Sequence, residues 1–297
     1  MLIKIILLLF VKSIWSYPIF LAPPMNPALW KIESPKIKQA RNAYSNFDYQ
    51  KCLSILGNKT TNTKPSNQNA WLKIELRIMS WVQLGNIKKS SHQLSVLRTV
   101  LDSQEDLIRL GLLSAIAELW TGEDDPRHCV KKLRNLRFQW KRINNNNLEI
   151  MAEMCHLAYL WLEERIEDMP ISLRNLEKKL GKLFNSKHPS WKTYHVYKIL
   201  VQTMKYEAQN RYIFPLFDQI DKANFTSKLQ SKFYKQATSG FCYMYKGETG
   251  RGLRHLESVL DLFEKNIGKS SPLTLQFGIK LGNILWDNNQ FITAYNL

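Results

Sequence analysis

The sequence predicts an all-α protein built from repeated helical hairpins, and three observations lead to this fold class. The chain of 297 residues contains only 12 glycines and 11 prolines, whereas proteins average roughly 7% glycine and 5% proline. Sheet-rich folds need more turn residues than this. From about residue 36 onward, apolar residues recur with a helical period. Turn-forming residues interrupt that pattern about every 40 residues, which indicates a repeat architecture.

The first 35 residues are predicted to lie outside the repeats. Residues 1–16 contain Lys4 and the apolar run Ile5–Val11, the shape of a short signal peptide, and a lysine then ends the run. Residues 17–35 hold five prolines, which favours an extended linker. We expect residues 1–16 to be a signal peptide or an N-terminal anchor. The protein would then be exported to the periplasm or outside the cell, or be held at a membrane by this segment, and a cytoplasmic location stays open.

The overall charge is strongly basic, with a formal net charge of +17. Such a charge suits an acidic partner, a nucleic acid or an anionic membrane surface. No run of five or six consecutive basic residues indicates a nucleic-acid arm, so we interpret the charge as a solvated basic surface. The four cysteines lack the spacing of a zinc site, and we expect buried free thiols.

In six predicted units a small residue follows the turn residue by four positions, and a seventh unit, over about residues 191–222, lacks this small residue. We expect these anchors to be buried where the two helices of a hairpin cross, because a long side chain there would hold the backbones apart. The turn residues and anchors are Asp48 with Cys52, Asn86 with Ser90, Asp125 with Cys129, Asp168 with Ser172, Glu248 with Gly252, and Gln290 with Ala294. A second small residue often precedes the turn residue by eight positions, as in Ala40, Ala117, Gly240 and Gly282. The two interlocked patterns indicate about seven hairpins over residues 36–297.

Residues 36–297 resemble the tetratricopeptide repeat (TPR) family, most strongly in the last and first units. The resemblance is carried by Leu281-Gly282-Asn283, Leu285, Asn289-Gln290-Phe291 and Ala294 in the last unit, and by Ala40, Tyr44, Asp48-Tyr49 and Cys52 in the first. It implies a right-handed superhelical solenoid of about seven stacked antiparallel hairpins. The repeat of about 40 residues exceeds the usual ~34 of the family, so longer loops or helices are expected.

The resemblance also implies that the first helix of each hairpin lines a concave partner groove. The residues that would face this groove lie three, four, seven and eleven positions before the turn residue. The apolar ones that we select as partner contacts are Met79, Phe241, Met244, Tyr245 and Trp286. Packing between repeats is the equal alternative for these side chains. The last predicted helix, from about Gln290, is half as long as its counterparts, so we expect either a truncation or a partner that covers its apolar side.

Motifs for catalysis or for cofactor and metal binding are not found. The chain has no HExxH, GxSxG, EF-hand or strand-linked GxGxxG sequence. We therefore expect a non-enzymatic scaffold without cofactors that binds a protein or peptide. One alternative is the extracytoplasmic sensory region of a truncated bacterial signalling protein of the histidine kinase or nucleotide cyclase type. A third is a basic helical-repeat nucleic-acid binder, against which the export signal argues, and a membrane contact is expected only through the N-terminal segment.

Overall fold

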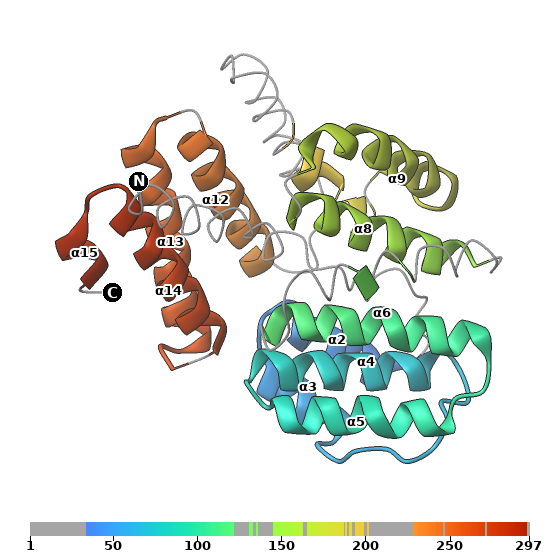
Figure 1. Cartoon of the computed structure of the whole chain (residues 1–297). Helices are drawn as coiled ribbons and strands as arrows, with labels where there is room; N and C mark the ends of the chain where they lie inside the picture. The colour runs from blue at the N-terminus through green and yellow to red at the C-terminus, as the bar shows by residue number, and fades with distance from the viewer. Residues whose placement is uncertain are drawn as a thin grey trace. The chain divides into compact units, whose positions relative to one another are not determined.

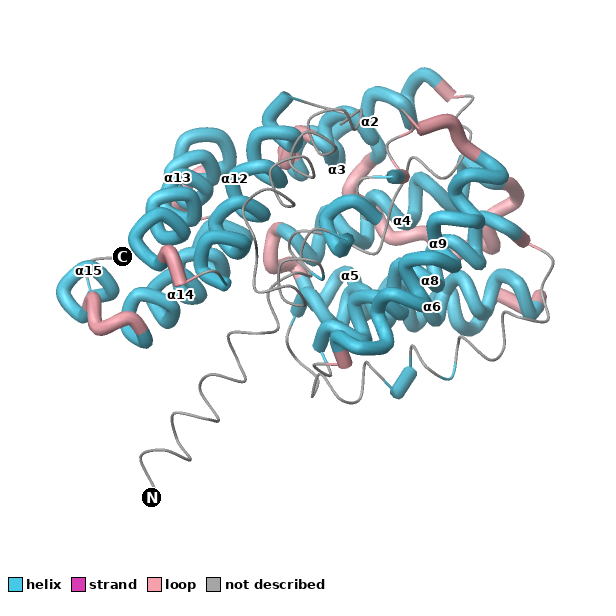
Figure 2. The backbone as a smooth tube through the Cα atoms, turned by 90° about the horizontal axis from the view of Figure 1, so that it is seen from above, coloured by secondary structure: helices cyan, strands magenta, loops and turns pink. Residues whose placement is uncertain are grey.

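In its described residues, the computed structural model of the chain consists of helices and loops (Figure 1). The described residues are 34–121, 131–132, 135, 145–162, 165–186, 188, 190–191, 194–198, 201, 228–245, 247–270 and 272–295. No strand occurs within these ranges, as the colouring of Figure 2 makes plain. The predicted all-α class is therefore confirmed for this part of the chain. The predicted signal peptide and most of the predicted linker lie outside the described residues.

Most of the helices follow one another at short intervals. Their bounds are α2 (Pro35–Ser45), α3 (Tyr49–Leu56), α4 (Gln68–Gln83), α5 (Ile87–Val100), α6 (Gln104–Thr121), α8 (Asn146–Leu162), α9 (Met169–Leu183), α12 (Lys228–Tyr245), α13 (Thr249–Ile267), α14 (Pro272–Asp287) and α15 (Phe291–Tyr295), with a 3-10 turn at Ile166–Asp168. Five of the predicted turn residues are described. Each directly precedes a helix, as predicted: Asp48, Asn86, Asp168, Glu248 and Gln290 lie before α3, α5, α9, α13 and α15.

Four hairpin turns share one backbone conformation. The residue before the turn residue has a positive φ, namely Phe47 (60°), Gly85 (70°), Gly247 (78°) and Asn289 (60°). The N–H of the turn residue then donates to the carbonyl five residues earlier: Asp48 to Ala43, Asn86 to Trp81, Glu248 to Tyr243 and Gln290 to Leu285. This left-handed residue with its backward hydrogen bond is the Schellman ending of a helix. The same Schellman ending therefore terminates the first helix in all four hairpins.

The described residues fall into two compact units. The N-terminal unit holds those up to Tyr159 together with Lys178–Leu183, and the C-terminal unit holds Leu160–Glu177 and those from Phe184 onward. In the N-terminal unit α2, α3, α4 and α5 pack in sequence, and the first helices α2, α4 and α6 are also neighbours (Figure 1). In the C-terminal unit α12, α13, α14 and α15 pack in sequence. Helix contacts are thus mostly between elements close in the chain.

The long loop between α3 and α4 is held by buried polar side chains. Trp81 donates its indole N–H to Asn58 Oδ1 over 2.6 Å. Gln93 accepts from the Thr61 N–H over 2.7 Å and donates to its carbonyl over 2.9 Å. The Arg77 guanidinium donates to Thr61 Oγ1 over 2.5 Å. These bonds satisfy loop groups that packing would otherwise leave without partners.

Candidate functional site

Exposed apolar side chains gather on the last two helices. Of the eight large apolar residues exposed on the described surface, five lie there: Leu275 (54%), Ile279 (66%) and Trp286 (58%) on α14, and Phe291 (45%) and Ile292 (80%) on α15. The other three are scattered over α6 and α9. We call the five residues of α14 and α15 the terminal apolar face.

The α14 part of this face is a continuous stripe. Leu275, Ile279 and Trp286 are spaced by four and seven residues, close to whole turns of an α-helix, so they lie on one side. The Trp286 ring meets the Phe291 ring edge to face, with centroids 4.8 Å apart, which joins α14 to α15. This ring contact therefore connects the α14 and α15 parts of the face. Contiguous exposed apolar patches are uncommon on soluble proteins unless they bind something.

The equivalent face of α12 is buried at three of its four positions, and at the fourth Met244 is half-buried. Counted back from the turn residue, Leu275, Ile279, Gly282 and Trp286 match Phe233, Ala237, Gly240 and Met244. Phe233 is 2% exposed and Ala237 is 1% exposed. The Phe233 ring lies 4.9 Å from that of Phe263, and a methyl group added to Gly240 would lie 2.7 Å from the Leu256 side chain. Helix α13 therefore covers on α12 the face that α14 exposes.

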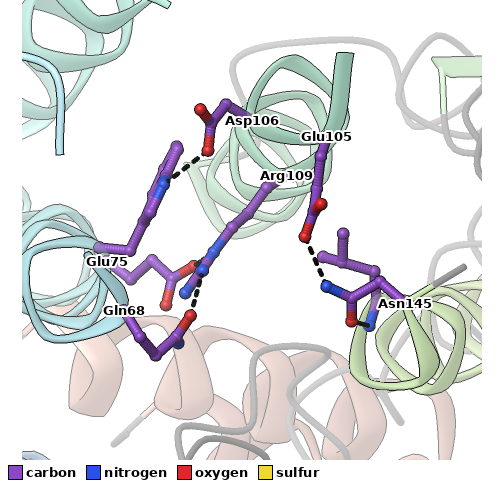
Figure 3. Close-up of polar contacts among 8 residues, drawn as sticks. Gln68, Glu75, Glu105, Asp106, Arg109 and Asn145 are labelled. Carbon is purple, nitrogen blue, oxygen red and sulfur yellow. Dashed lines mark hydrogen bonds and ion pairs between the residues drawn. The ribbon is translucent and has the colours of Figure 1, made fainter. Parts of the chain in front are cut away.

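The corresponding face of α4 is buried as well. Its residues at these positions are Trp71, Glu75, Ile78 and Val82, and all four are buried. Arg109 of α6 pairs with Glu75 over 2.6 Å and donates to Gln68 over 2.9 Å, while Trp71 donates to Asp106 over 2.8 Å (Figure 3). A helix thus covers this face in a second hairpin too. Here the buried carboxylate requires a paired cation, because an uncompensated buried charge is costly.

The residues predicted to line a partner groove have different surroundings. Met79 is completely buried and Phe241 is 8% exposed. Burial removes these two side chains from any surface that a partner could contact, because neighbouring helices already pack on them. Met244 is half-buried against Gly252, and the side chain of Tyr245 lies outside what the structure describes. Of the predicted groove residues, only Trp286 is exposed in the described chain, within the terminal apolar face.

The predicted anchors are mostly buried. Cys52, Ser90, Ser172 and Gly252 are all buried, and Cys129 lies outside the described residues. A methyl group on Gly252 would lie 2.8 Å from the Gly240 carbonyl oxygen, so the two backbones approach closely. Ala294 is half-exposed instead of buried, because α15 has five residues and leaves its outer side open.

Sequence reasoning placed Ile279 at a groove-facing position, eleven residues before Gln290, without selecting it as a partner contact, and it gave no such role to Leu275 or Ile292. Leu275 lies fifteen residues before its turn residue, as Phe233 does in α12, so both positions are apolar. The pattern therefore indicated an apolar face. The pattern does not indicate whether another helix covers that face, because this depends on which helix packs beside it.

A concave surface lies between α5 and α6 in the N-terminal unit. This groove of about 800 Å³ is lined by serines and leucines that include Ser91, Leu94 and Leu110. At its wall Glu118 accepts from Lys132 over 2.7 Å, so these two charges compensate each other. Most of residues 122–144 lies outside the described part. The terminal apolar face is the stronger candidate because it gathers five of the eight large apolar side chains exposed on the described surface.

Packing shifts the pKa of several described side chains, among them Cys52 and His255. Burial raises the pKa of the Cys52 thiol to about 11, so the thiol is protonated and unreactive near neutral pH. Burial, followed by Arg251 and Arg254, lowers the pKa of His255. The His255 ring stacks on Tyr243 at 5.3 Å.

Metal sites, membrane spans and known relatives do not narrow the choice of function. Among the described residues, no group of three or more His, Cys, Asp or Glu side chains is arranged to hold a metal ion. No helix in the described ranges has both the length and the apolarity to cross a membrane. Comparisons with protein-family models, curated proteins and solved structures found no match. The functional argument therefore depends on this chain's own residues.

Proposed function

We propose that this protein is a non-enzymatic, TPR-like helical-repeat scaffold that binds another protein through the terminal apolar face. Two features support the repeat architecture. Four hairpins end their first helix with the same turn, and the first helices α2, α4 and α6 are neighbours. On this proposal about seven hairpins stack as a right-handed solenoid.

One observation carries the binding proposal: a face that is buried in α4 and α12 is exposed in α14. Burying a large apolar side chain contributes about 1.5 to 3 kcal/mol. Leu275, Ile279 and Trp286 would each contribute on that scale when a partner covers them. Tryptophan is also among the residues enriched at energetic hot spots of protein interfaces.

The experiment is affinity capture with the tagged full chain from extracts of the source cells. Captured proteins are identified and quantified by mass spectrometry for wild type and for Ile279→Lys, which places a charge in the centre of the face. Because truncating a hot-spot residue costs about 2 kcal/mol or more, or ~30-fold in affinity, a genuine partner should be largely lost from Ile279→Lys.

The matched control is Ile171→Lys, the same substitution at an exposed isoleucine of α9 (56% exposed). It should capture the same partner as wild type. Circular dichroism of both variants checks that the helices are retained. Equal capture by Ile279→Lys and wild type would contradict the proposed function.

A further inference from the structure

The loop between α3 and α4 contains a short sequence that the proposed binding function does not use. Asn58-Lys59-Thr60 has the form Asn-x-Thr, with a residue other than proline in the middle. This form is the acceptor sequence for N-linked glycans in proteins that enter a secretory compartment. Because the sequence is short, the surroundings of Asn58 decide whether a glycan fits there.

Asn58 lies on the surface, just beyond the end of α3. Gly57 follows the last residue of that helix with a φ of 84°, and Asn58 and Lys59 form a bend after it. The Asn58 residue is exposed. An exposed loop position accommodates a bulky, hydrophilic group without disturbing the core.

The Asn58 amide is oriented by one hydrogen bond. The indole N–H of Trp81 donates to Asn58 Oδ1 over 2.6 Å, and Trp81 is completely buried. An indole N–H can only donate, so the amide oxygen and not the amide nitrogen must face it. Asn58 Nδ2 has no hydrogen-bond partner among the described residues. The nitrogen that carries an N-linked glycan is therefore the amide atom that the fold leaves unused.

A glycan on Nδ2 is also compatible with the contacts that hold the loop. The glycosylated side chain is still an amide, so its oxygen can still accept from Trp81. Trp81 lies 23 residues after Asn58, and Arg77, which donates to the Lys59 carbonyl, lies 18 residues after Lys59. During synthesis Asn58 therefore emerges before the side chains that fix the loop, and a transferase can reach it before the loop folds.

We propose that Asn58 is an N-glycosylation site. This inference is independent of the proposed binding function and rests on the export that residues 1–16 predict. The sugar donor is an oligosaccharide linked to a lipid diphosphate. Asn58 Nδ2 forms a bond to C1 of the first sugar and loses one proton, while the bond from C1 to the diphosphate oxygen breaks and the lipid diphosphate leaves. Thr60 supplies the hydroxyl that the acceptor sequence requires.

The test is site-resolved mass spectrometry of the tagged full chain purified from the source cells. Peptide-N-glycosidase in heavy-oxygen water converts a glycosylated asparagine into an isotopically labelled aspartate. We expect labelled aspartate at position 58. Asn224-Phe225-Thr226 has the same form and lies outside the described residues, so peptide mapping assigns the label to its position. Recovery of residue 58 only as unmodified asparagine would overturn the inference.

Two variants of Thr60 make the result specific. Thr60→Ala removes the required hydroxyl and leaves both residues of the Asn58–Trp81 hydrogen bond in place, so it should abolish the label at position 58 in a protein that still folds. Thr60→Ser keeps a hydroxyl and should retain the label. Circular dichroism checks that both variants keep their helices. A label at position 58 that persists in Thr60→Ala would indicate a different modification and contradict the proposal.

Discussion

The hairpins α12–α13 and α14–α15 have the same start and different ends. Both have a positive-φ residue before the turn residue, and both cross at a glycine of the first helix. Phe233 is nevertheless 2% exposed, while its counterpart Leu275 is 54% exposed. The comparison teaches that the repeat sets which side of a first helix is apolar, whereas the neighbouring helix decides whether that side is core or surface.

The difference has an energetic consequence for each hairpin. Phe233, Phe263 and Phe277 form a cluster of rings, with centroids 4.9 Å and 5.6 Å apart, that joins α12, α13 and α14. The terminal apolar face contributes nothing comparable to folding, because its side chains remain in water. Mutations at matching positions should therefore separate stability from binding.

The largest expected difference is between Phe233→Ala and Leu275→Ala. Removing the buried Phe233 ring should lower the free energy of unfolding by about 3 to 5 kcal/mol. Removing the exposed Leu275 side chain should change it by about 0.5 kcal/mol or less. Urea unfolding followed by circular dichroism measures both. Similar losses in the two variants would mean that α14 is covered as α12 is, and the comparison would fail.

The two crossing glycines provide a smaller contrast. In Gly240→Ala the new methyl group would lie 2.7 Å from Leu256, so the helices must move apart, at a cost of about 1 to 3 kcal/mol. In Gly282→Ala the nearest atom is 3.8 Å away, and the better helix propensity of alanine should stabilise by up to about 1 kcal/mol. Thermal unfolding of the two variants would show melting temperatures that shift in opposite directions. A decrease in both melting temperatures would mean that the methyl group added at position 282 is in close contact with another group.

The smallest expected effect concerns pH. The side chain of His255, on α13, contacts α12, with its Nδ1 2.6 Å from Gln236 Oε1. Burial, and then Arg251 and Arg254, lower the pKa of His255. A folded-state pKa below the usual value means that the unfolded chain binds the proton more tightly, so stability should decrease as pH falls through about 6.5. His255→Gln should lose stability less steeply between pH 7 and pH 5 in urea titrations. An unchanged slope would show that His255 is not the group responsible.

Much of the local structure could be predicted from the sequence. Asp48, Asn86 and Glu248 directly precede helices. The turn needs a residue in the left-handed conformation followed by the start of a helix, and both requirements favour particular residue types close together in the sequence. Phe47 is the exception, since an aromatic residue with φ of 60° gives no such signal. The small residues at the crossing of α12 and α13 follow from close backbone approach, which is also local in the sequence.

Coverage of the apolar faces could not be predicted in the same way. Met79 and Trp286 belong to the same pattern of first-helix positions, yet one is completely buried and the other is 58% exposed. The partner of Glu75 is Arg109, 34 residues further along the chain. Such pairings depend on how successive hairpins pack, and a single sequence shows only the face that each helix offers.

The central claim is that α14 exposes the face that α12 buries, and thiol labelling at matching positions tests it most directly. Ala237→Cys and Ile279→Cys are treated with iodoacetamide in the native full chain, and peptide mapping gives the labelling rate at each position. We predict that Cys at 279 reacts at nearly the rate of an exposed thiol and Cys at 237 at least about 100-fold more slowly, because its labelling requires α13 to open at a cost of roughly 3 kcal/mol or more. Equal protection at the two positions would contradict the account.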